Sequence, residues 1–260
     1  MKKRFPISAL FLIVATTVYA QQAASDIQEN IKKMKERLGD RLLTTADEVI
    51  AKHVEAVGGR EAIQSVKTLM LKARVVYGGA FPNLYRFYQQ PNLLRVRTSP
   101  GGGSYTLTDG EKVWAVNPEG RRELHGWAAQ SLSHHRLDGN FIDYKNRGVK
   151  VEYIGLEDFG TGPNMYYHLR RTFPDGFMEE LYFDVETGLL IGIRPTSSPQ
   201  KILHLYYDYK NIGGILLAHM WVTVSEKASP PHILVIEEVR INEDFGEKFF
   251  TEYKDKPIQK

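Results

Sequence analysis

The sequence predicts a mainly β protein built on one large, strongly curved antiparallel sheet that helices cover. From residue 66 onward apolar and polar residues alternate, as in half-buried strands. Turn signals such as Asp109–Gly110 and Glu186–Thr187–Gly188 recur at roughly the 8 to 12 residue spacing of strands joined by hairpins. Eleven or twelve strands in one meander are too many for a flat open sheet, which curls or closes. We therefore expect a bent sheet with a sheltered inner face.

Helices are expected before the sheet and once within it. Thr45 and Glu48 have the spacing of a capping box that starts a helix, and Gly58–Gly59 supply its left-handed stop. Apolar residues at helical spacing between positions 27 and 38 predict a narrower amphipathic helix. Residues 124–137 show no alternation and predict an inserted helix that covers the concave mouth as a lid. The strands are expected at residues 66–77, 85–89, 93–98, 105–108, 113–116, 149–154, 165–172, 178–184, 189–194, 202–209, 220–224 and 233–241.

The first twenty residues have the pattern of a secretory signal peptide. A basic start, Lys2–Lys3–Arg4, precedes an apolar run over residues 7–18, and small side chains mark a cleavage point after Ala20. That run is shorter than the roughly 20 residues a membrane-spanning helix needs. We predict export to the periplasm, with a signal peptide at 1–20, an amphipathic helix and linker at 21–44, and a single domain at 45–260.

Composition excludes several classes of function. The chain contains no Cys, so disulfides, thiol chemistry and lipidation of a cysteine are excluded. It has 34 Lys and Arg against 31 Asp and Glu, and the predicted leader holds three of the basic residues and no acidic one. The mature chain is therefore neutral, which removes the charge argument for nucleic acid as a partner.

Arginine clusters on the predicted strands do not change that conclusion. Arg95, Arg97, Arg170 and Arg171 stand among aromatic residues, as a nucleic-acid platform requires. In a neutral exported chain, solvated sheet faces or cross-strand ion pairs explain them better.

The sequence predicts no catalytic or metal site and no cofactor. His134 and His135 are adjacent, whereas ligands on one helix face stand three or four residues apart. Glu179 and Glu180 are successive strand residues, so their side chains point to opposite faces and do not flank one bond. The chain contains no Gly-x-Ser-x-Gly, no His-Glu-x-x-His and no phosphate-binding glycine loop before a helix. We expect a protein that is not an enzyme.

Several short motifs in a fixed order resemble those of one protein family. They are Gln90–Pro91–Asn92–Leu93, Asp109–Gly110 with Lys112, Trp114, and Asn117–Pro118. Similar motifs in this order and spacing occur in the periplasmic lipoprotein carriers known as LolA-like proteins, also called outer membrane lipoprotein-sorting proteins. A larger group of exported LolA-like proteins is more similar still, and its motifs are matched by Gly58–Gly59, Asp143–Tyr144–Lys145, Asp184–Leu190 and Asp208–Ile215. The resemblance covers roughly residues 45–245.

The resemblance implies a strongly curved, incomplete β-barrel with a helical lid and an apolar groove. In the carriers this groove shields lipoprotein acyl chains, and an Arg just before the Pro holds the backbone of the lid. Here that latch position is Gln90, which brings no charge, so the latch is expected to be weaker. Donor or acceptor membrane proteins of the envelope are possible further partners.

We expect an acyl chain of a lipid or lipoprotein to bind in this groove. The alternatives are an envelope interaction or scaffold protein whose interior its own side chains fill, and, less favoured, a hydrolase. In a closed sandwich the same aromatic residues would simply form the core. The residues predicted to line the groove and lid are Leu71, Val75, Tyr85, Phe87, Val96, Trp114, Trp127, Leu132, Tyr166, Phe183, Tyr207 and Trp221.

Overall fold

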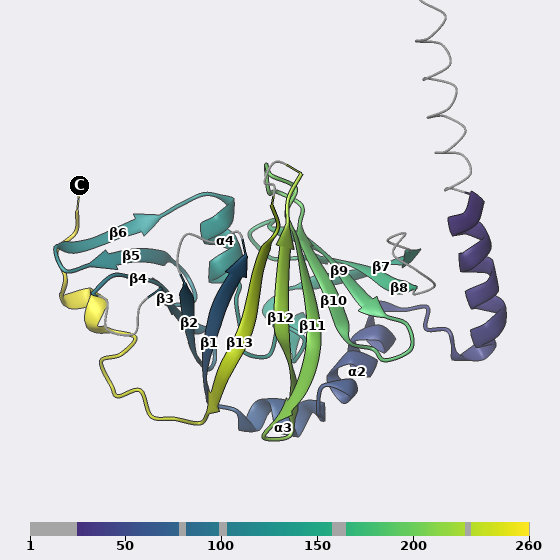
Figure 1. The fold of residues 1–260 in the computed structure, drawn as a ribbon, viewed down its shortest axis with the longest axis horizontal. Helices are drawn as coiled ribbons and strands as arrows, with labels where there is room; N and C mark the ends of the chain where they lie inside the picture. The colour runs from purple at the N-terminus through teal and green to yellow at the C-terminus, as the bar shows by residue number, and fades with distance from the viewer. Residues whose placement is uncertain (1–24, 78–81, 99–102, 158–164, 227–229, 260) are drawn as a thin grey trace, which may run out of the picture.

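One antiparallel sheet of thirteen strands curves round on itself and stays unclosed, as Figure 1 shows. The structure is a computed structural model that describes residues 25–77, 82–98, 103–157, 165–226 and 230–259. The predicted signal peptide at residues 1–20 lies outside the described residues. The curved, mainly β fold expected from alternation and turn spacing is confirmed.

Each strand pairs with the next one along the chain, except that β6 and β7 lie at opposite edges of the sheet. Their order across the sheet is β6-β5-β4-β3-β2-β1-β13-β12-β11-β10-β9-β8-β7, so the first and last strands pair at its centre. The strands are β1 (Thr68–Tyr77), β2 (Asn83–Gln89), β3 (Leu93–Arg97), β4 (Tyr105–Thr108), β5 (Val113–Asn117), β6 (Gly120–Leu124), β7 (Lys150–Glu157), β8 (Tyr166–Thr172), β9 (Met178–Asp184), β10 (Leu190–Pro195), β11 (Leu203–Ile212), β12 (Ile215–Val224) and β13 (His232–Ile241). Only β6 has no counterpart among the strands predicted from sequence.

The helices cover the ends of the curved sheet. α2 (Ala46–Ala56) and α3 (Gly59–Ser65) run along its lower end in Figure 1, while α4 (Trp127–Ser133) lies near its upper end. The predicted capping box is present: the Thr45 hydroxyl accepts from the Glu48 N–H at 3.3 Å, and the Glu48 carboxylate accepts from the Thr45 N–H at 3.0 Å. Short 3₁₀ turns lie at Gly39–Arg41 (η1), Tyr144–Arg147 (η2) and Glu252–Asp255 (η3).

Gly58 ends α2 as predicted, but a second helix begins directly after it. Its φ of +119° lies in the left-handed region, and a Cβ there would overlap the carbonyl oxygen of Gly214 in the β11–β12 hairpin. The Leu216 N–H donates to the Val57 carbonyl at 3.0 Å beside this contact. The glycine pairs Gly58–Gly59 and Gly213–Gly214, which are far apart in sequence, therefore allow the helices to approach the sheet closely.

Both faces of the sheet are apolar, and different segments cover them. On the concave face, α2, α3 and residues 138–147 pack against two hydrophobic clusters that contain Val49, Phe183 and Leu71. On the convex face, the C-terminal residues 245–253 pack against Phe87 and its neighbours on β1 to β5. Residues 25–38 form the predicted helix and pack on the first cluster through Met34 and Leu38.

The close approach at Gly58 gives a test of how the helices are attached. We expect Gly58→Ala to lower the free energy of unfolding by about 1–3 kcal/mol more than Gly176→Ala. Gly176 also has a positive φ, +85°, but a Cβ there would meet nothing within 4 Å. Both variants share the backbone strain of roughly 1–2 kcal/mol, so urea unfolding of the pair isolates the contact with Gly214. Equal losses in the two variants would show that the contact does not hold α2 in place.

Candidate functional site

The concave face is filled at one end and half open at the other. Across β8 and β9, the inward residues Tyr167, Leu169, Leu181 and Phe183 are 0% exposed beneath α2 and residues 138–147. Across β1 to β3 and β12, Leu69, Leu71, Leu94 and Ile215 on the same face are buried as well, but some apolar residues beside them, from these strands and from α4 and the segment after it, are only half-buried. We call these the concave patch, and they are Val75, Leu84, Val96, Leu132, Leu137 and Trp221. The patch leaves apolar surface accessible on the sheltered side of the sheet.

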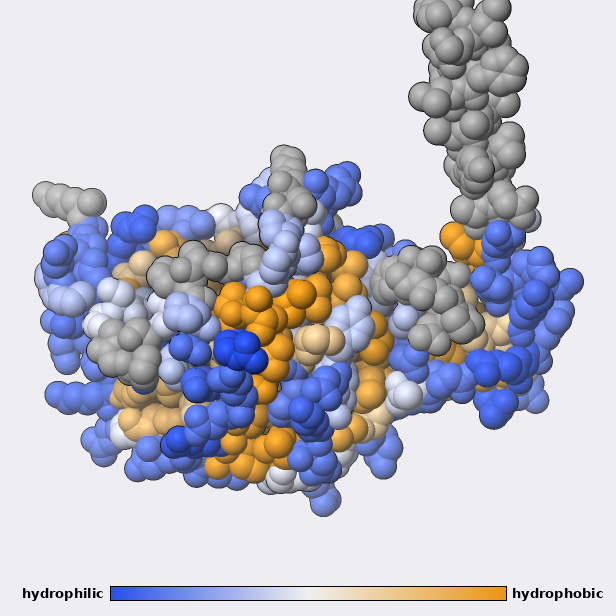
Figure 2. Space-filling model, in the orientation of Figure 1, coloured by the Kyte–Doolittle hydropathy of each residue, from blue (hydrophilic) through white to orange (hydrophobic). Residues whose placement is uncertain are grey.

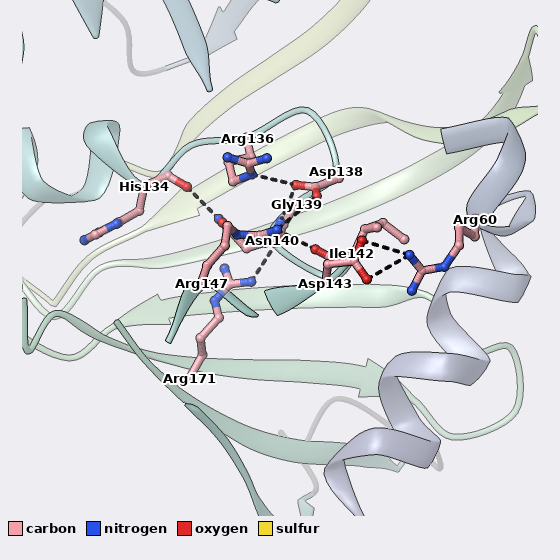
Figure 3. Close-up of polar contacts among 10 residues, drawn as sticks. All are labelled: Arg60, His134, Arg136, Asp138, Gly139, Asn140, Ile142, Asp143, Arg147 and Arg171. Carbon is pink, nitrogen blue, oxygen red and sulfur yellow. Dashed lines mark hydrogen bonds and ion pairs between the residues drawn. The ribbon is translucent and has the colours of Figure 1, made fainter. Parts of the chain in front are cut away.

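Residues 138–147, which we call the strap, cross the concave face between α4 and α2. Figure 3 shows the polar contacts that hold the strap in place. The Asn140 amide donates to the His134 carbonyl at 2.6 Å, and Arg147 donates to the Ile142 carbonyl at 2.6 Å. Arg60 from α3 forms two 3.0 Å contacts with the Asp143 carboxylate. These bonds connect the lid helix, the strap and α3 into one cover.

A buried ion pair fixes the strap to the sheet. Arg171 on β8 is 4% exposed, and its guanidinium lies 2.6 Å from the carboxylate of Glu179 on β9. The same guanidinium donates to the Gly139 carbonyl of the strap at 2.6 Å. Because the pair is desolvated and fully bonded, loss of either partner leaves an uncompensated charge, which typically costs about 3–5 kcal/mol.

Arg86 reaches across the concave face from the other side. β2 and β12 are separated by β1 and β13, a distance of about 14 Å in a flat sheet with strands about 4.8 Å apart. The Arg86 guanidinium carbon nevertheless lies 5.1 Å from the centre of the Trp221 ring. The curvature of the sheet therefore places a cation against an aromatic ring within the concave patch.

Two histidines lie near this cation, and both are neutral at pH 7. Burial, reinforced by the positive charge of Arg86, lowers the pKa of His135 to about 3 and that of His204 to about 4. His135 Nδ1 donates to the Ser131 carbonyl at 2.8 Å, which leaves Nε2 as an acceptor. Arg86 is therefore the charged group of this cluster.

The predicted groove residues separate onto two faces of the sheet. Leu71, Val75, Val96, Phe183 and Trp221 face the concave side, and Leu132 packs there from α4. Phe183 is fully buried under α2, so it belongs to the filled end. Trp127 is the first residue of α4 and is half-buried.

The other five predicted residues lie on the convex side. The prediction that all twelve residues line one groove is therefore wrong for these five. Their strand registers place them opposite to the concave set, because successive side chains alternate between faces. Three of them pack with the C-terminal segment, and Tyr207 is 38% exposed. Alternation alone does not show which apolar face of a two-faced sheet is concave. The five are Tyr85, Phe87, Trp114, Tyr166 and Tyr207.

Gln90, the predicted latch position, contacts the backbone directly after α3. Its side-chain amide donates to the Val66 carbonyl at 2.7 Å, and its backbone N–H donates to the Lys67 carbonyl at 2.9 Å. The inserted helix itself is present as α4, but it spans only Trp127–Ser133 of the predicted stretch 124–137, and Leu124 at the start of that stretch is the last residue of β6. α4 is tied at its C-terminal end by His134, whose ring stacks on Phe173 at 3.8 Å and contacts Asp175 at 3.0 Å.

Other candidate groups are structural in the part of the chain that the structure describes. Glu179 pairs with Arg171, while Glu180 contacts Arg170 and His168 on the opposite face. No group of three potential metal ligands occurs among the described residues. A surface pocket of about 640 Å³ lies away from the patch, at the start of α2, between Asp47, Tyr144 and Tyr153. No helix among the described residues is long and apolar enough to cross a membrane.

Sequence reasoning missed Arg86, His204 and Leu84. The signal for Arg86 was present: it is a lone charge in the inward series Leu84, Arg86 and Tyr88, where an apolar residue is expected. Its significance depends on curvature, which brings β2 opposite β12 and which no local pattern encodes.

Comparison with known proteins supports the fold. No protein-family model and no curated protein matches the chain. Among solved structures, a LolA superfamily protein from Nitrosomonas europaea aligns with a TM-score of 0.53 at 15% identity, over 80% of this chain and 98% of the other. A DUF1329 family protein from Desulfovibrio piger aligns with a TM-score of 0.52 at 13% identity, over 80% and 97%. A putative outer membrane lipoprotein-sorting protein domain from Vibrio parahaemolyticus aligns with a TM-score of 0.51 at 10% identity, over 78% and 97%. The expected LolA-like fold is thus confirmed.

The neutral histidines predict a pH dependence of stability. An unfolded His takes up a proton near pH 6.5, whereas folded His135 and His204 resist protonation until about pH 3 and 4. The stability that the two neutral rings contribute to the folded protein is therefore present above pH 6.5 and is lost as the pH falls toward 4. Replacing both by Gln should flatten the slope of unfolding free energy against pH, measured with urea from pH 4.5 to 7.5.

A third histidine supplies a control of opposite sign. Burial opposes the charged form of His168, but its bonds to Glu157 and Glu180 outweigh burial and raise its pKa. Its contribution is present at low pH and lost as the pH rises, so His168→Gln should steepen the slope. An unchanged slope in the His135/His204 double variant would show that these rings titrate normally.

Proposed function

We propose that this protein is a periplasmic carrier that shields an acyl chain of a lipid or lipoprotein on the concave patch. The observation that supports the proposal is the half-buried state of the six apolar residues of the patch, beside a filled core on the same face. Removing hydrocarbon from water stabilises a complex by about 0.8 kcal/mol for each methylene group. Half-covered apolar surface on the inner face of a curved sheet offers that burial without a catalytic group.

The cover over the patch supports reversible occupancy. Leu132 and Leu137 belong to α4 and the segment after it, which polar contacts hold at His134, Asn140 and the Arg171–Glu179 pair. Polar contacts exchange with water at modest net cost, about 0.5–1.5 kcal/mol for a neutral hydrogen bond. The strap stays anchored through the buried side chains of Phe141 and Ile142 and through Arg171, so α4 with Leu132 is the part of the cover that can move aside when a chain enters. The solved LolA superfamily and lipoprotein-sorting structures share this fold, which is consistent with the proposal.

A second candidate is an envelope interaction or scaffold protein that acts through its surface. The filled end of the concave face favours it, because the chain's own residues occupy that half of the interior. Figure 2 shows hydrophobic residues gathered over the central strands. Tyr77 of β1 and Tyr207 of β11 are 51% and 38% exposed. Such a protein would take up no acyl chain.

Uptake of a fluorescent fatty acid and of an acylated peptide distinguishes the two. We expect both probes to bind, and Val96→Asp or Leu132→Asp to weaken binding by at least about tenfold, because each places a charge on apolar surface that the chain must cover. Tyr207→Asp on the convex face is the matched control and should change binding by less than about twofold. The dissociation constants come from fluorescence titration.

Absence of uptake of either probe by the unaltered protein would contradict the carrier and support the scaffold. An equal loss in Tyr207→Asp would place the binding surface on the convex face instead.

A further inference from the structure

Arg86 carries a charge that the described part of the protein does not neutralise. Its cross-strand neighbours on the concave face are Leu71 and Val96. Its Nη1 donates to the Tyr88 hydroxyl at 3.2 Å, and its Nε is buried without any hydrogen-bond partner. No carboxylate among the described residues forms an ion pair with it.

Arg171, at the filled end of the concave face, shows the contrast. Arg171 lies 2.6 Å from Glu179 and also donates to the strap. An unpaired, partly desolvated guanidinium is costly to the folded protein. The cost is offset when an anion occupies the site, because a planar guanidinium binds two oxygens of a carboxylate or phosphate at once.

We propose that Arg86 binds the anionic headgroup, a carboxylate or a phosphate, of an amphiphile whose hydrocarbon chain lies on the concave patch. This inference rests on the proposed carrier function and names the chemical class of its ligand. The headgroup sits against the Trp221 ring and the Tyr88 hydroxyl, with Leu84 and Val96 beside it for the first methylenes of the chain. The neighbouring histidines are uncharged at pH 7, so Arg86 supplies the attraction.

The apolar surroundings favour an amphiphile over a free anion. A carboxylate without a chain would give up its hydration and gain a single charge contact, whereas a chain adds burial of hydrocarbon at the same site. A low local dielectric then strengthens the ion pair relative to one on the surface.

Equilibrium dialysis of the full chain with oleate and oleyl alcohol tests the proposal, since the two ligands share a hydrocarbon chain and differ in headgroup charge. We expect oleate to bind at least about tenfold more tightly than oleyl alcohol. A lysophosphatidic acid of the same chain tests the phosphate headgroup and should bind like oleate. Acetate and inorganic phosphate test the free anion and should not bind at millimolar concentration.

Variants assign the preference to Arg86. Arg86→Gln should weaken oleate binding by about tenfold and change oleyl alcohol binding by less than about threefold, while Arg86→Lys should retain part of the preference. Arg97→Gln is the matched control, because Arg97 lies on the next strand but on the convex face, over the Phe87 ring. It should leave both affinities within about twofold.

The folding of the ligand-free variants supplies a second readout. Because Arg86 lacks a carboxylate partner, Arg86→Gln should keep or raise the thermal midpoint of the ligand-free protein. A large fall in that midpoint would show that Arg86 is a structural residue, and would overturn the proposal.

The outcomes separate this inference from the carrier function. Equal affinity for oleate and oleyl alcohol, unchanged in Arg86→Gln, would overturn the role of Arg86 and leave the carrier intact. No binding of any lipid would overturn the carrier as well. Binding of acetate or phosphate that depends on Arg86, without binding of oleate, would replace the amphiphile by a small anion.

Discussion

The structure depends on one constraint: a single sheet with apolar side chains on both faces needs a cover on each. Curvature alone shelters only the concave face. The C-terminal residues 245–253 cover the convex side of β1 to β5. The concave side is covered by α2, α3, α4 and the strap. The covering is unequal, because the strap reaches the end of the sheet near β8 and β9 but leaves the patch around Trp221 half-covered.

Curvature also explains why charge occurs inside an apolar face. It brings Arg86 and Trp221 together from strands that are not neighbours, and it brings His135, which follows α4, close enough for the Arg86 charge to lower the pKa of that ring. At the filled end, the Arg171–Glu179 pair serves a different purpose, since it is satisfied internally and holds the strap. Arg171 is thus a paired cation that positions the cover, whereas Arg86 lacks a carboxylate partner and lies within the open patch.

Much of the fold was predictable because its signals are local. The capping box at Thr45 and Glu48 and the alternation of strands such as β9 depend only on residues close in sequence. The faces were not predictable: Phe87 and Trp114 carry the same pattern as Val96, and only the path of the C-terminal segment shows which side each one meets. β6 was missed because Gly120 and two arginines interrupt the alternation there. The partner of Gln90, the Val66 carbonyl beside α3, was likewise not readable from the sequence, because residues 66 and 90 meet only in the folded chain.

The most direct measurement is covalent labelling with a fatty acid that carries a photoreactive diazirine in its chain, followed by peptide mapping. The account predicts adducts on the concave patch, at Leu84 and Val96 on the adjacent strands β2 and β3, at Trp221 on β12 and at Leu132 on α4, which all face the inner side of the sheet. Adducts confined to the outer face, at Leu205, Tyr207 and Val222, or no adducts at all, would contradict it.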